Sequence, residues 1–454
     1  MSKNKIFPKI AKIEYLAKIP EHWKVWKISN AFKKVGSGTT PDSGNPAFYN
    51  GDIPWVNTSE LRENIITDTS AKVTEYALKQ HPILTLYPPN TLLIAMYGAT
   101  IGRLGILGIT ACTNQACCAL AEPIHINSKF CFYWLQSKRN EIIADSSGGG
   151  QKNINQEKIR SLRISAPSLH EQHLIADYLD RETTQIDNLI AAKEQMLTLL
   201  EEKREALISH AVTRGLDPNV TLKASDAPWF DKTPQHWSVE RLKLVIKSVA
   251  SGVSVNASDQ PIEKDGFGVL KTSSVSRGRF IPNENKSVWD TEFKRLACPV
   301  RQNSIIISRM NTPSLVGESG YVEFDYPNLF LPDRLWQIKF NEERIYVPFM
   351  ALLISSKEAR HALSSKATGT SPSMKNLAIE EMSSLPVPIP PIGEQIAIHE
   401  AISQQDNNVY SLKHALINSI ALLKERRSAL ITAAVTGQIN IQEMSKHSQN
   451  EVSQ

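Results

Sequence analysis

Residues 202–213 read EKREALISHAVT, and residues 425–436 read ERRSALITAAVT, so one pattern of twelve residues occurs twice in this chain. The two copies are 223 residues apart. The same offset relates Glu171-Gln172 to Glu394-Gln395, and the register holds without a gap for about sixty residues. A repeat at one fixed offset over this length indicates an internal duplication. The prediction of the fold starts from this duplication.

Both copies carry apolar residues at seven-residue steps, from Leu179 to Leu207 in the first copy and from Ile402 to Leu430 in the second. Such a repeat over four heptads favours two long helices that pack together as a coiled coil. A helix over residues 171–212 would be roughly 60 Å long, too long for burial in one ordinary domain. The residues predicted to pair the helices or to dock a partner protein are Leu179, Ile186, Leu200, Leu207, Ile402, Val409, Leu416, Leu423 and Leu430.

The apolar seam of the first copy differs from that of the second. Lys193 interrupts it at the position where the second copy has Leu416. Leu189 and Met196 are expected at the intermediate steps of this seam, between the seven-residue positions. Two unrelated surface helices are the alternative interpretation, and the shared register disfavours it.

The length of 454 residues exceeds what one hydrophobic core usually serves and indicates two or three domains. The most apolar stretch, residues 91–121, contains Arg103 and four glycines, so no membrane span is predicted. The first twelve residues are basic without the apolar segment of a signal peptide, and a cytoplasmic location is expected. Five cysteines, none in a CxxC pair, support neither a disulfide framework nor a zinc site.

The net charge of +5 is unevenly distributed along the chain. Residues 1–166 carry +8 and residues 216–389 carry +2, which together make +10. The helical segments are neutral or acidic. Basic lobes joined to such helices favour a polyanion partner for the lobes and a protein partner for the helices. A solvated basic face is the alternative.

Each half of the chain opens with a similar element, Pro20-Glu21-His22-Trp23 in the first half and Pro234-Gln235-His236-Trp237 in the second. Short apolar runs bounded by Gly, Pro and Asn follow, which is typical of strands joined by turns. The predicted strands are residues 52–56, 91–96 and 104–109 in the first half and 268–271 and 304–308 in the second. The predicted shorter helices are residues 130–143 and 346–363.

These elements predict an α+β fold with two mixed α/β lobes, which are separated by two long antiparallel coiled-coil-like helices and related by a pseudo-two-fold internal repeat. The predicted segments are residues 1–166 for the first lobe, 167–216 for the central long helix, 217–389 for the second lobe, 390–440 for the distal long helix, and 441–454 for a polar tail that is expected to be disordered.

Catalytic motifs are not evident in the sequence. No stretch matches the phosphate-binding pattern GxxxxGK[ST], and no acid cluster, metal-ligand set or catalytic triad stands above background. The lobes instead contain loops whose side chains can pair with base edges or phosphates, although the same residue types are common in ordinary loops. The candidate DNA-binding residues are Ser37, Thr39, Thr40, Tyr97, Arg103, Asn114, Gln115, Lys152, Asn153, Ser274, Arg277, Arg279, Arg309, Asn311, Lys375 and Asn376.

Two diverged lobes, each opened by Pro-x-His-Trp and each followed by a helix that begins Pro-x-x-x-Glu-Gln and ends Ala-Leu-Ile-x-x-Ala-Val-Thr, closely resemble the specificity subunit of Type I restriction-modification systems. The resemblance covers nearly the whole chain and is most specific in the helices. It implies two target-recognition domains, each of which reads one half of a split, asymmetric DNA sequence, and helices that dock partner subunits.

The resemblance also implies that this chain is not an enzyme and binds no cofactor or metal itself. Its partners would be double-stranded DNA, two methyltransferase subunits that bind S-adenosylmethionine, and two restriction subunits that use ATP and Mg²⁺ to translocate and cut DNA. One alternative is a fused adenine methyltransferase-specificity protein, against which the missing cofactor and Pro-Pro-Tyr motifs count. The other is a coiled-coil scaffold without a DNA function, which the +10 charge of the lobes disfavours.

Overall fold

The computed structural model describes residues 20–144, 153–263, 266–276, 278–371, 373–442 and 444. The chain forms two compact units. Unit 1 consists of residues 1–193 and 418–454, and unit 2 consists of residues 194–417. Two long helices, α6 (Leu169–Arg214) and α10 (Ile392–Val435), each begin in one unit and end in the other, so each unit contains one lobe and part of both helices. None of the helices in the described ranges is long and apolar enough to cross a membrane.

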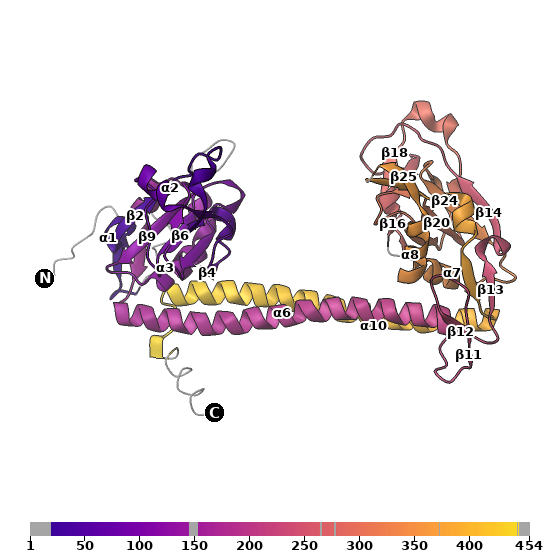
Figure 1. The fold of residues 1–454 in the computed structure, drawn as a ribbon. Helices are drawn as coiled ribbons and strands as arrows, with labels where there is room; N and C mark the ends of the chain where they lie inside the picture. Colours follow the sequence, from indigo (N-terminus) through magenta and orange to yellow (C-terminus); the bar gives the residue numbers. More distant parts are fainter. Residues whose placement is uncertain are drawn as a thin grey trace. The chain divides into compact units, whose positions relative to one another are not determined.

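The lobe of unit 1 is built on a five-stranded sheet in the order β2-β9-β6-β7-β4 (Figure 1). Its strands are β2 (Phe32–Ser37), β9 (Cys117–Pro123), β6 (Leu92–Ala95), β7 (Leu104–Leu107) and β4 (Asn64–Ile66). The smaller sheets are formed by β1 (Lys24–Lys27) with β10 (Arg163–Ala166), and by β5 (Lys72–Val73), β3 (Tyr49–Val56) and β8 (Cys112–Thr113). The α-helices of this lobe are α1 (Ile28–Ala31), α2 (Glu75–Gln80), α3 (Ser128–Ser137), α4 (Arg139–Ala144) and α5 (Gln156–Ser161).

The lobe of unit 2 is built on a six-stranded sheet in the order β14-β24-β20-β22-β17-β16. Its strands are β14 (Ile246–Ser251), β24 (Leu335–Phe340), β20 (Ser304–Ser308), β22 (Ser319–Val322), β17 (Gly278–Phe280) and β16 (Val275–Ser276). A four-stranded sheet contains β18 (Asn285–Ser287), β15 (Gly268–Leu270), β23 (Tyr326–Phe330) and β19 (Pro299–Val300).

Smaller elements complete the lobe of unit 2. A three-stranded sheet contains β21 (Met310–Asn311), β26 (Met374–Asn376) and β25 (Thr368–Ser371). The two-stranded sheets pair β11 (Leu222–Ala224) with β12 (Lys232–Pro234), and β13 (Ser238–Arg241) with β27 (Pro386–Ile389). The helices are α7 (Val347–Ser355), α8 (Lys357–Lys366) and α9 (Ile379–Ser383).

The predicted fold class is confirmed. All five predicted strands are present, as β3, β6, β7, β15 and β20, and the two predicted shorter helices are present as the pairs α3 with α4 and α7 with α8. The two units repeat one arrangement. In each, a mixed sheet with mainly antiparallel pairs is followed along the chain by apolar helices and then by a long helix.

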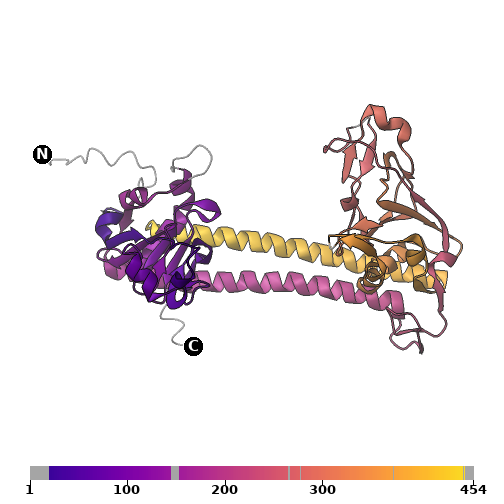
Figure 2. The same ribbon diagram turned by 45° about the horizontal axis from the view of Figure 1, so that its top comes forward.

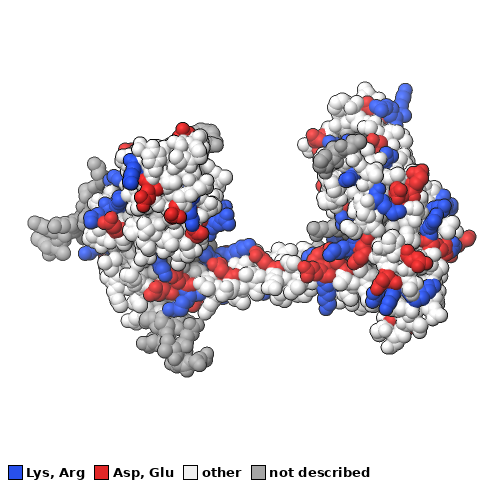
Figure 3. All heavy atoms as spheres, in the orientation of Figure 1, with Lys and Arg blue, Asp and Glu red and all other residues white. Residues whose placement is uncertain are grey.

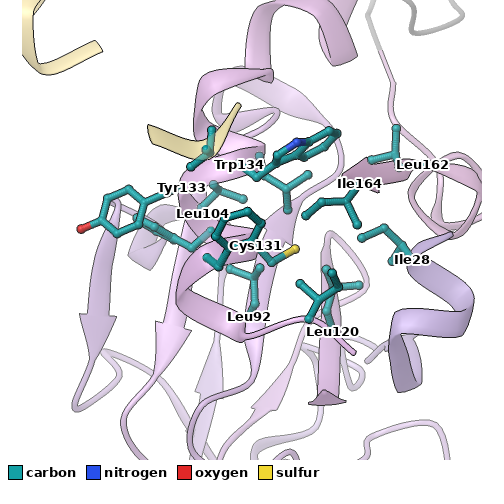
Figure 4. Close-up of a cluster of buried hydrophobic side chains, with 14 of the residues drawn as sticks. Ile28, Leu92, Leu104, Leu120, Cys131, Tyr133, Trp134, Leu162 and Ile164 are labelled. Atoms are coloured by element: carbon teal, nitrogen blue, oxygen red, sulfur yellow. The ribbon is translucent and has the colours of Figure 1, made fainter. Parts of the chain in front are cut away.

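The core of unit 1 is continuous from the lobe to the long helices. Figure 4 shows Leu92 and Leu120 from the sheet packed beside Cys131 and Trp134 of α3. The same cluster includes Leu179 of α6 and residues near the end of α10. Burial of this apolar surface, at about 25 cal/mol per Å², holds each helix end to the lobe of its unit.

The long helices pair antiparallel within each unit and lie side by side in both views of the ribbon (Figures 1 and 2). The predicted pairing residues Ile186, Ile402 and Leu416 are each 5% exposed, and Leu179 is fully buried. The remaining predicted seam residues are half-buried, namely Leu200, Leu207, Val409, Leu423 and Leu430.

The intermediate seam positions were predicted wrongly. Leu189 and Met196 are 52% and 46% exposed, and the seam instead continues through the buried Ile190 and the half-buried Leu197. Apolar residues stand both three and four residues after Ile186 and after Lys193, so spacing alone did not choose between them. Lys193 is half-buried in this seam, where its methylene stem can cover apolar surface while the charge reaches water.

The repeated Glu-Gln pair has a structural role in each unit. Gln172 and Gln395 are both fully buried, and each side chain donates two hydrogen bonds and accepts one. The main-chain partners of Gln172 are those of His125, Asn127 and Pro167, and the partners of Gln395 are those of Arg344, Tyr346 and Pro390. A single glutamine thereby connects the start of a long helix to the start of the apolar helix in its lobe.

The repeated His-Trp element packs where one long helix ends and the other begins. In unit 2 the indole of Trp237 donates a 2.9 Å hydrogen bond to Glu394, and it lies beside Gly215 at the end of α6. In unit 1 Trp23 lies beside Gly437 at the end of α10. Both glycines have positive φ, +79° and +73°, the left-handed conformation common after a helix. The tryptophan of the His-Trp element therefore packs against the C-terminal end of one long helix in each unit.

The predicted tail requires one correction. Met444 is 1% exposed and belongs to the core cluster of unit 1, so the expectation of a disordered segment from residue 441 fails there. Residues 445–454 lie outside the described ranges.

Candidate nucleic-acid interface

In each lobe, the residue that follows a central strand makes the same pattern of main-chain hydrogen bonds. In unit 1 this position is Met96, which follows β6. Its N–H donates to Ala116 O at 2.8 Å, and its carbonyl accepts from Ile154 N–H at 2.8 Å. Ile154 ends the segment Lys152-Asn153-Ile154, which the offset of 223 residues repeats as Lys375-Asn376-Leu377, so the hydrogen bond brings Asn153 close to the end of β6. The predicted residues Tyr97 and Asn153, which are 56 residues apart in sequence, therefore lie in neighbouring loops.

In unit 2 the equivalent position is Arg309, which follows β20. Its N–H donates to Arg334 O at 3.0 Å, and its carbonyl accepts from Leu377 N–H at 2.8 Å. Leu377 closes the second Lys-Asn motif, and β21 pairs with β26 in the register that places Asn311 opposite Lys375. Four predicted residues, Arg309, Asn311, Lys375 and Asn376, are thus assembled on adjacent strands.

In unit 1 the predicted loop residues gather around the turn after β2. The hydroxyl of Thr40 donates to the side-chain carbonyl of Gln115. Ser37 donates to the side chain of Gln156 at 3.3 Å. The side chains of Thr40, Gln115 and Asn153 are exposed, and Thr39 is half-buried. The loops after β2, β6 and β8 therefore form one polar surface in which sequence-distant residues meet.

Two predicted asparagines are engaged inside their own loops. The side chain of Asn114 donates to Asn57 at 3.1 Å and accepts from the N–H groups of Ala116 and Cys117. Asn311 donates to Ser308 at 3.2 Å and accepts from Thr312 N–H. These side-chain amides stabilise the conformations of their loops. To bond to a base, each amide would first have to break hydrogen bonds within its own loop.

The other predicted residues are placed as follows. Ser274 is fully buried, so its hydroxyl is not at the surface and we remove it from the candidate interface. Arg103 and Arg279 are exposed, and Arg279 lines a cavity of about 640 Å³ beside the helices of unit 2. Lys152 and Arg277 lie outside the described residues.

In unit 2 the predicted residue Arg309 packs against Trp336, which was not among the predicted residues. The guanidinium of Arg309 lies 5.4 Å from the ring centroid of Trp336, within the range of a cation–π interaction. Trp336 is 2% exposed and belongs to the core cluster. No sequence signal marks Trp336 as a partner of Arg309, because the pairing of β20 with β24 brings them together.

The tyrosine and cysteine side chains near the candidate interface of unit 1 are uncharged at neutral pH. Burial raises the pKa of Tyr97, with a smaller contribution from Cys117, so its phenol stays protonated at neutral pH. Burial also raises the pKa values of Cys112 and Cys118 to about 12, which keeps these thiols neutral and unreactive. Figure 3 shows basic side chains interspersed with acidic ones on the visible face of each lobe. No group of acidic, His or Cys residues in the described ranges could hold a metal ion.

Comparison with known proteins identifies the family. The sequence profile of the Type I restriction modification DNA specificity domain matches residues 20–200 and again residues 234–422. The chain belongs to this family. Its two matches correspond to the two copies of the duplication, each made of a lobe and most of the helix that follows it.

Specificity subunits of named systems are similar over most of their length. The Escherichia coli EcoKI specificity subunit is 24% identical over 440 residues, which cover 94% of this chain and 91% of that subunit. The MjaVIII specificity subunit of Methanocaldococcus jannaschii is 22% identical over 432 residues, 94% of this chain and 95% of that subunit. The similarity to these bacterial and archaeal subunits therefore extends over both halves of this chain.

Solved structures share the fold. A chain from a structure of the assembly and conformational transition of a type I restriction-modification system has a TM-score of 0.71 at 15% identity, over 93% of this chain and all of that one. The HsdS subunit of Thermoanaerobacter tengcongensis has a TM-score of 0.52 at 14% identity, over 93% of this chain and 98% of that one. These likenesses support the two-lobed, two-helix architecture of the specificity subunits.

Proposed function

We propose that this chain is the DNA-recognition subunit of a Type I restriction-modification complex, and that each lobe reads one half of a bipartite, asymmetric site. The observation that carries the proposal is the equivalence of Met96 and Arg309. Both follow a central strand and both accept a hydrogen bond from the loop of a repeated Lys-Asn motif. The scaffold is repeated while the side chains differ, as expected of two readers of different sequences.

The long helices would dock the methyltransferase subunits. The predicted docking residues Leu179, Ile186, Ile402 and Leu416 are buried in the seam and in the lobe cores, so they serve helix pairing and are not available to a partner. Docking would instead use apolar side chains that remain exposed on the helices. These are Leu169, Leu189 and Leu422 in unit 1, and Met196, Leu199, Ile392, Ile396, Tyr410, Leu412 and Ile417 in unit 2.

The remaining parts of the proposal concern partners. Two methyltransferase subunits would supply S-adenosylmethionine binding and adenine methylation, and two restriction subunits would supply ATP hydrolysis, translocation and cleavage with Mg²⁺. This chain would contribute no catalytic residue and would hold no cofactor. Family membership favours this function over the fused methyltransferase and the coiled-coil scaffold.

A lobe exchange tests the proposal. Residues 217–385 are replaced by the corresponding segment of another specificity subunit, and the chimera is expressed with the methyltransferase subunits in a host without adenine methylation. Sequencing of methylated bases should show that one half of the target changes while the other half and the spacer persist. A matched chimera that replaces residues 20–160 should change the opposite half. A change in both halves, or in neither, would contradict modular reading.

A further inference from the structure

The end of β20 in unit 2 holds one cation in a fixed position. The main chain of Arg309 is fixed on both sides, by Arg334 O and by Leu377 N–H. Its guanidinium lies over the indole of Trp336, which is itself buried between core residues. An arginine loses side-chain entropy when it binds a ligand, and this one has already lost part of that freedom in the folded protein.

The hydrogen bonding around Arg309 is incomplete. Its Nε atom is buried without a hydrogen-bond partner in the described structure, and the Oδ1 atom of Asn376 is in the same condition. Asn376 lies opposite Met310 on the paired strand β26, so both atoms belong to one small sheet region. Because Nε faces the protein, the two terminal nitrogens of Arg309 are the donors that remain for a ligand. Two parallel donors match the O6 and N7 acceptors on the major-groove edge of guanine.

The equivalent position of unit 1 has no such group. The strand pairing that sets Ile307 opposite Trp336 in unit 2 sets Ile94 opposite Cys118 in unit 1, so Cys118 takes the place of Trp336. Met96 takes the place of Arg309, and a thioether offers no hydrogen-bond donor. The duplication thus provides its own comparison, because Met96 and Cys118 in unit 1 stand where Arg309 and Trp336 stand in unit 2.

We propose that Arg309, supported by Trp336, contacts a guanine in the half-site read by unit 2, and that this contact makes a G·C pair obligatory there. This inference rests on the proposed function. The neighbouring Lys375, on a flexible aliphatic stem, suits a phosphate oxygen and would position the duplex without selecting a base. Recognition at this position would therefore be divided between a rigid base reader and a mobile backbone contact.

The test uses the full chain with its methyltransferase subunits and a plasmid library of randomised sites. Wild type, Arg309→Met and Arg309→Lys are compared with Arg301→Lys, an exposed arginine before the opposite end of β20. Wild type should require guanine at one position of one half-site. Arg309→Met, which installs the residue of unit 1, should reduce that preference on the order of 10- to 100-fold, the usual worth of one bidentate base contact. The other positions, the other half and the Arg301→Lys profile should not change.

The outcomes separate this inference from the function on which it rests. If wild type directs no methylation to a bipartite site, the proposed function fails. If wild type does so but Arg309→Met keeps its full preference for guanine, or weakens methylation equally at all sequences as a lost phosphate contact would, the inference is wrong. If Arg309→Met abolishes methylation, Arg309→Lys decides, because the retained charge should preserve binding while guanine selection weakens. Unchanged selection in that variant overturns the proposal.

Discussion

The ion pair between Arg204 of α6 and Asp406 of α10 should fix the register of the two helices in unit 2. Arg204 Nε and Nη2 donate to the two carboxylate oxygens at 2.6 and 2.7 Å. The side chains are only 19% and 26% exposed. The hydrogen bonds to Asp406 raise the pKa of Arg204 above its usual value, so the pair remains ionised over the working pH range. We expect Arg204→Ala and Asp406→Ala each to weaken the helix pairing.

The magnitude follows from burial and geometry. Exposed ion pairs contribute about 0–1 kcal/mol, whereas breaking a fully buried pair costs about 3–5 kcal/mol. A bidentate, charge-assisted pair at this intermediate burial should cost about 2 kcal/mol when Arg204 is removed. Asp406→Ala should cost less, because Glu201 and Glu205 also interact with the Arg204 charge.

The assay is a double-mutant cycle read by hydrogen exchange of the α10 amides in unit 2, since a chain with two units need not unfold in one step. We expect a coupling free energy of about 1.5 kcal/mol between Arg204 and Asp406. The matched control is the pair of Arg427 and Asp187 in unit 1, at 2.8 Å, in which Asp187 is 51% exposed. Its coupling should stay below about 1 kcal/mol. Equal couplings, or one below about 0.5 kcal/mol for Arg204 with Asp406, would refute this reasoning.

Three further predictions concern the assembled protein. Because the lobes carry +10, DNA affinity of the methyltransferase complex should fall steeply between about 50 and 200 mM salt, and a flat titration would contradict a phosphate contribution. A heptad inserted after both Glu194 and Ile417 should lengthen each helix by about 10 Å and the preferred spacer by about three base pairs; methylation of a spacer library checks this. Burial lowers the pKa of His399 below 6.5, so the unfolded chain takes up the proton first as pH falls and stability should decrease below about pH 6.5. Thermal denaturation should show a weaker pH dependence in His399→Gln, and equal slopes would contradict this assignment.

The sequence predicted the elements whose signals are local. The heptad steps from Leu179 to Leu207 and from Ile402 to Leu430 specify long helices, because a periodic apolar stripe requires a facing partner. The apolar run at residues 304–308 specified a buried strand, which is β20. The candidate interface was only partly predictable. Polar loops could be found by composition, but Ser274, Asn114 and Asn311 differ in burial and hydrogen bonding in ways that composition does not distinguish.

By itself the sequence determined the duplication, the two long helices with their shared register, and the class of the lobes, because repeats and periodicity are properties of neighbouring residues. Tertiary structure decided which apolar residues enter the seam, since Leu189 and Ile190 both fit the spacing and only packing selects Ile190. It also decided that Arg309 lies on Trp336. That contact depends on the register between β20 and β24, which hydrogen bonds across the sheet set and no local pattern encodes.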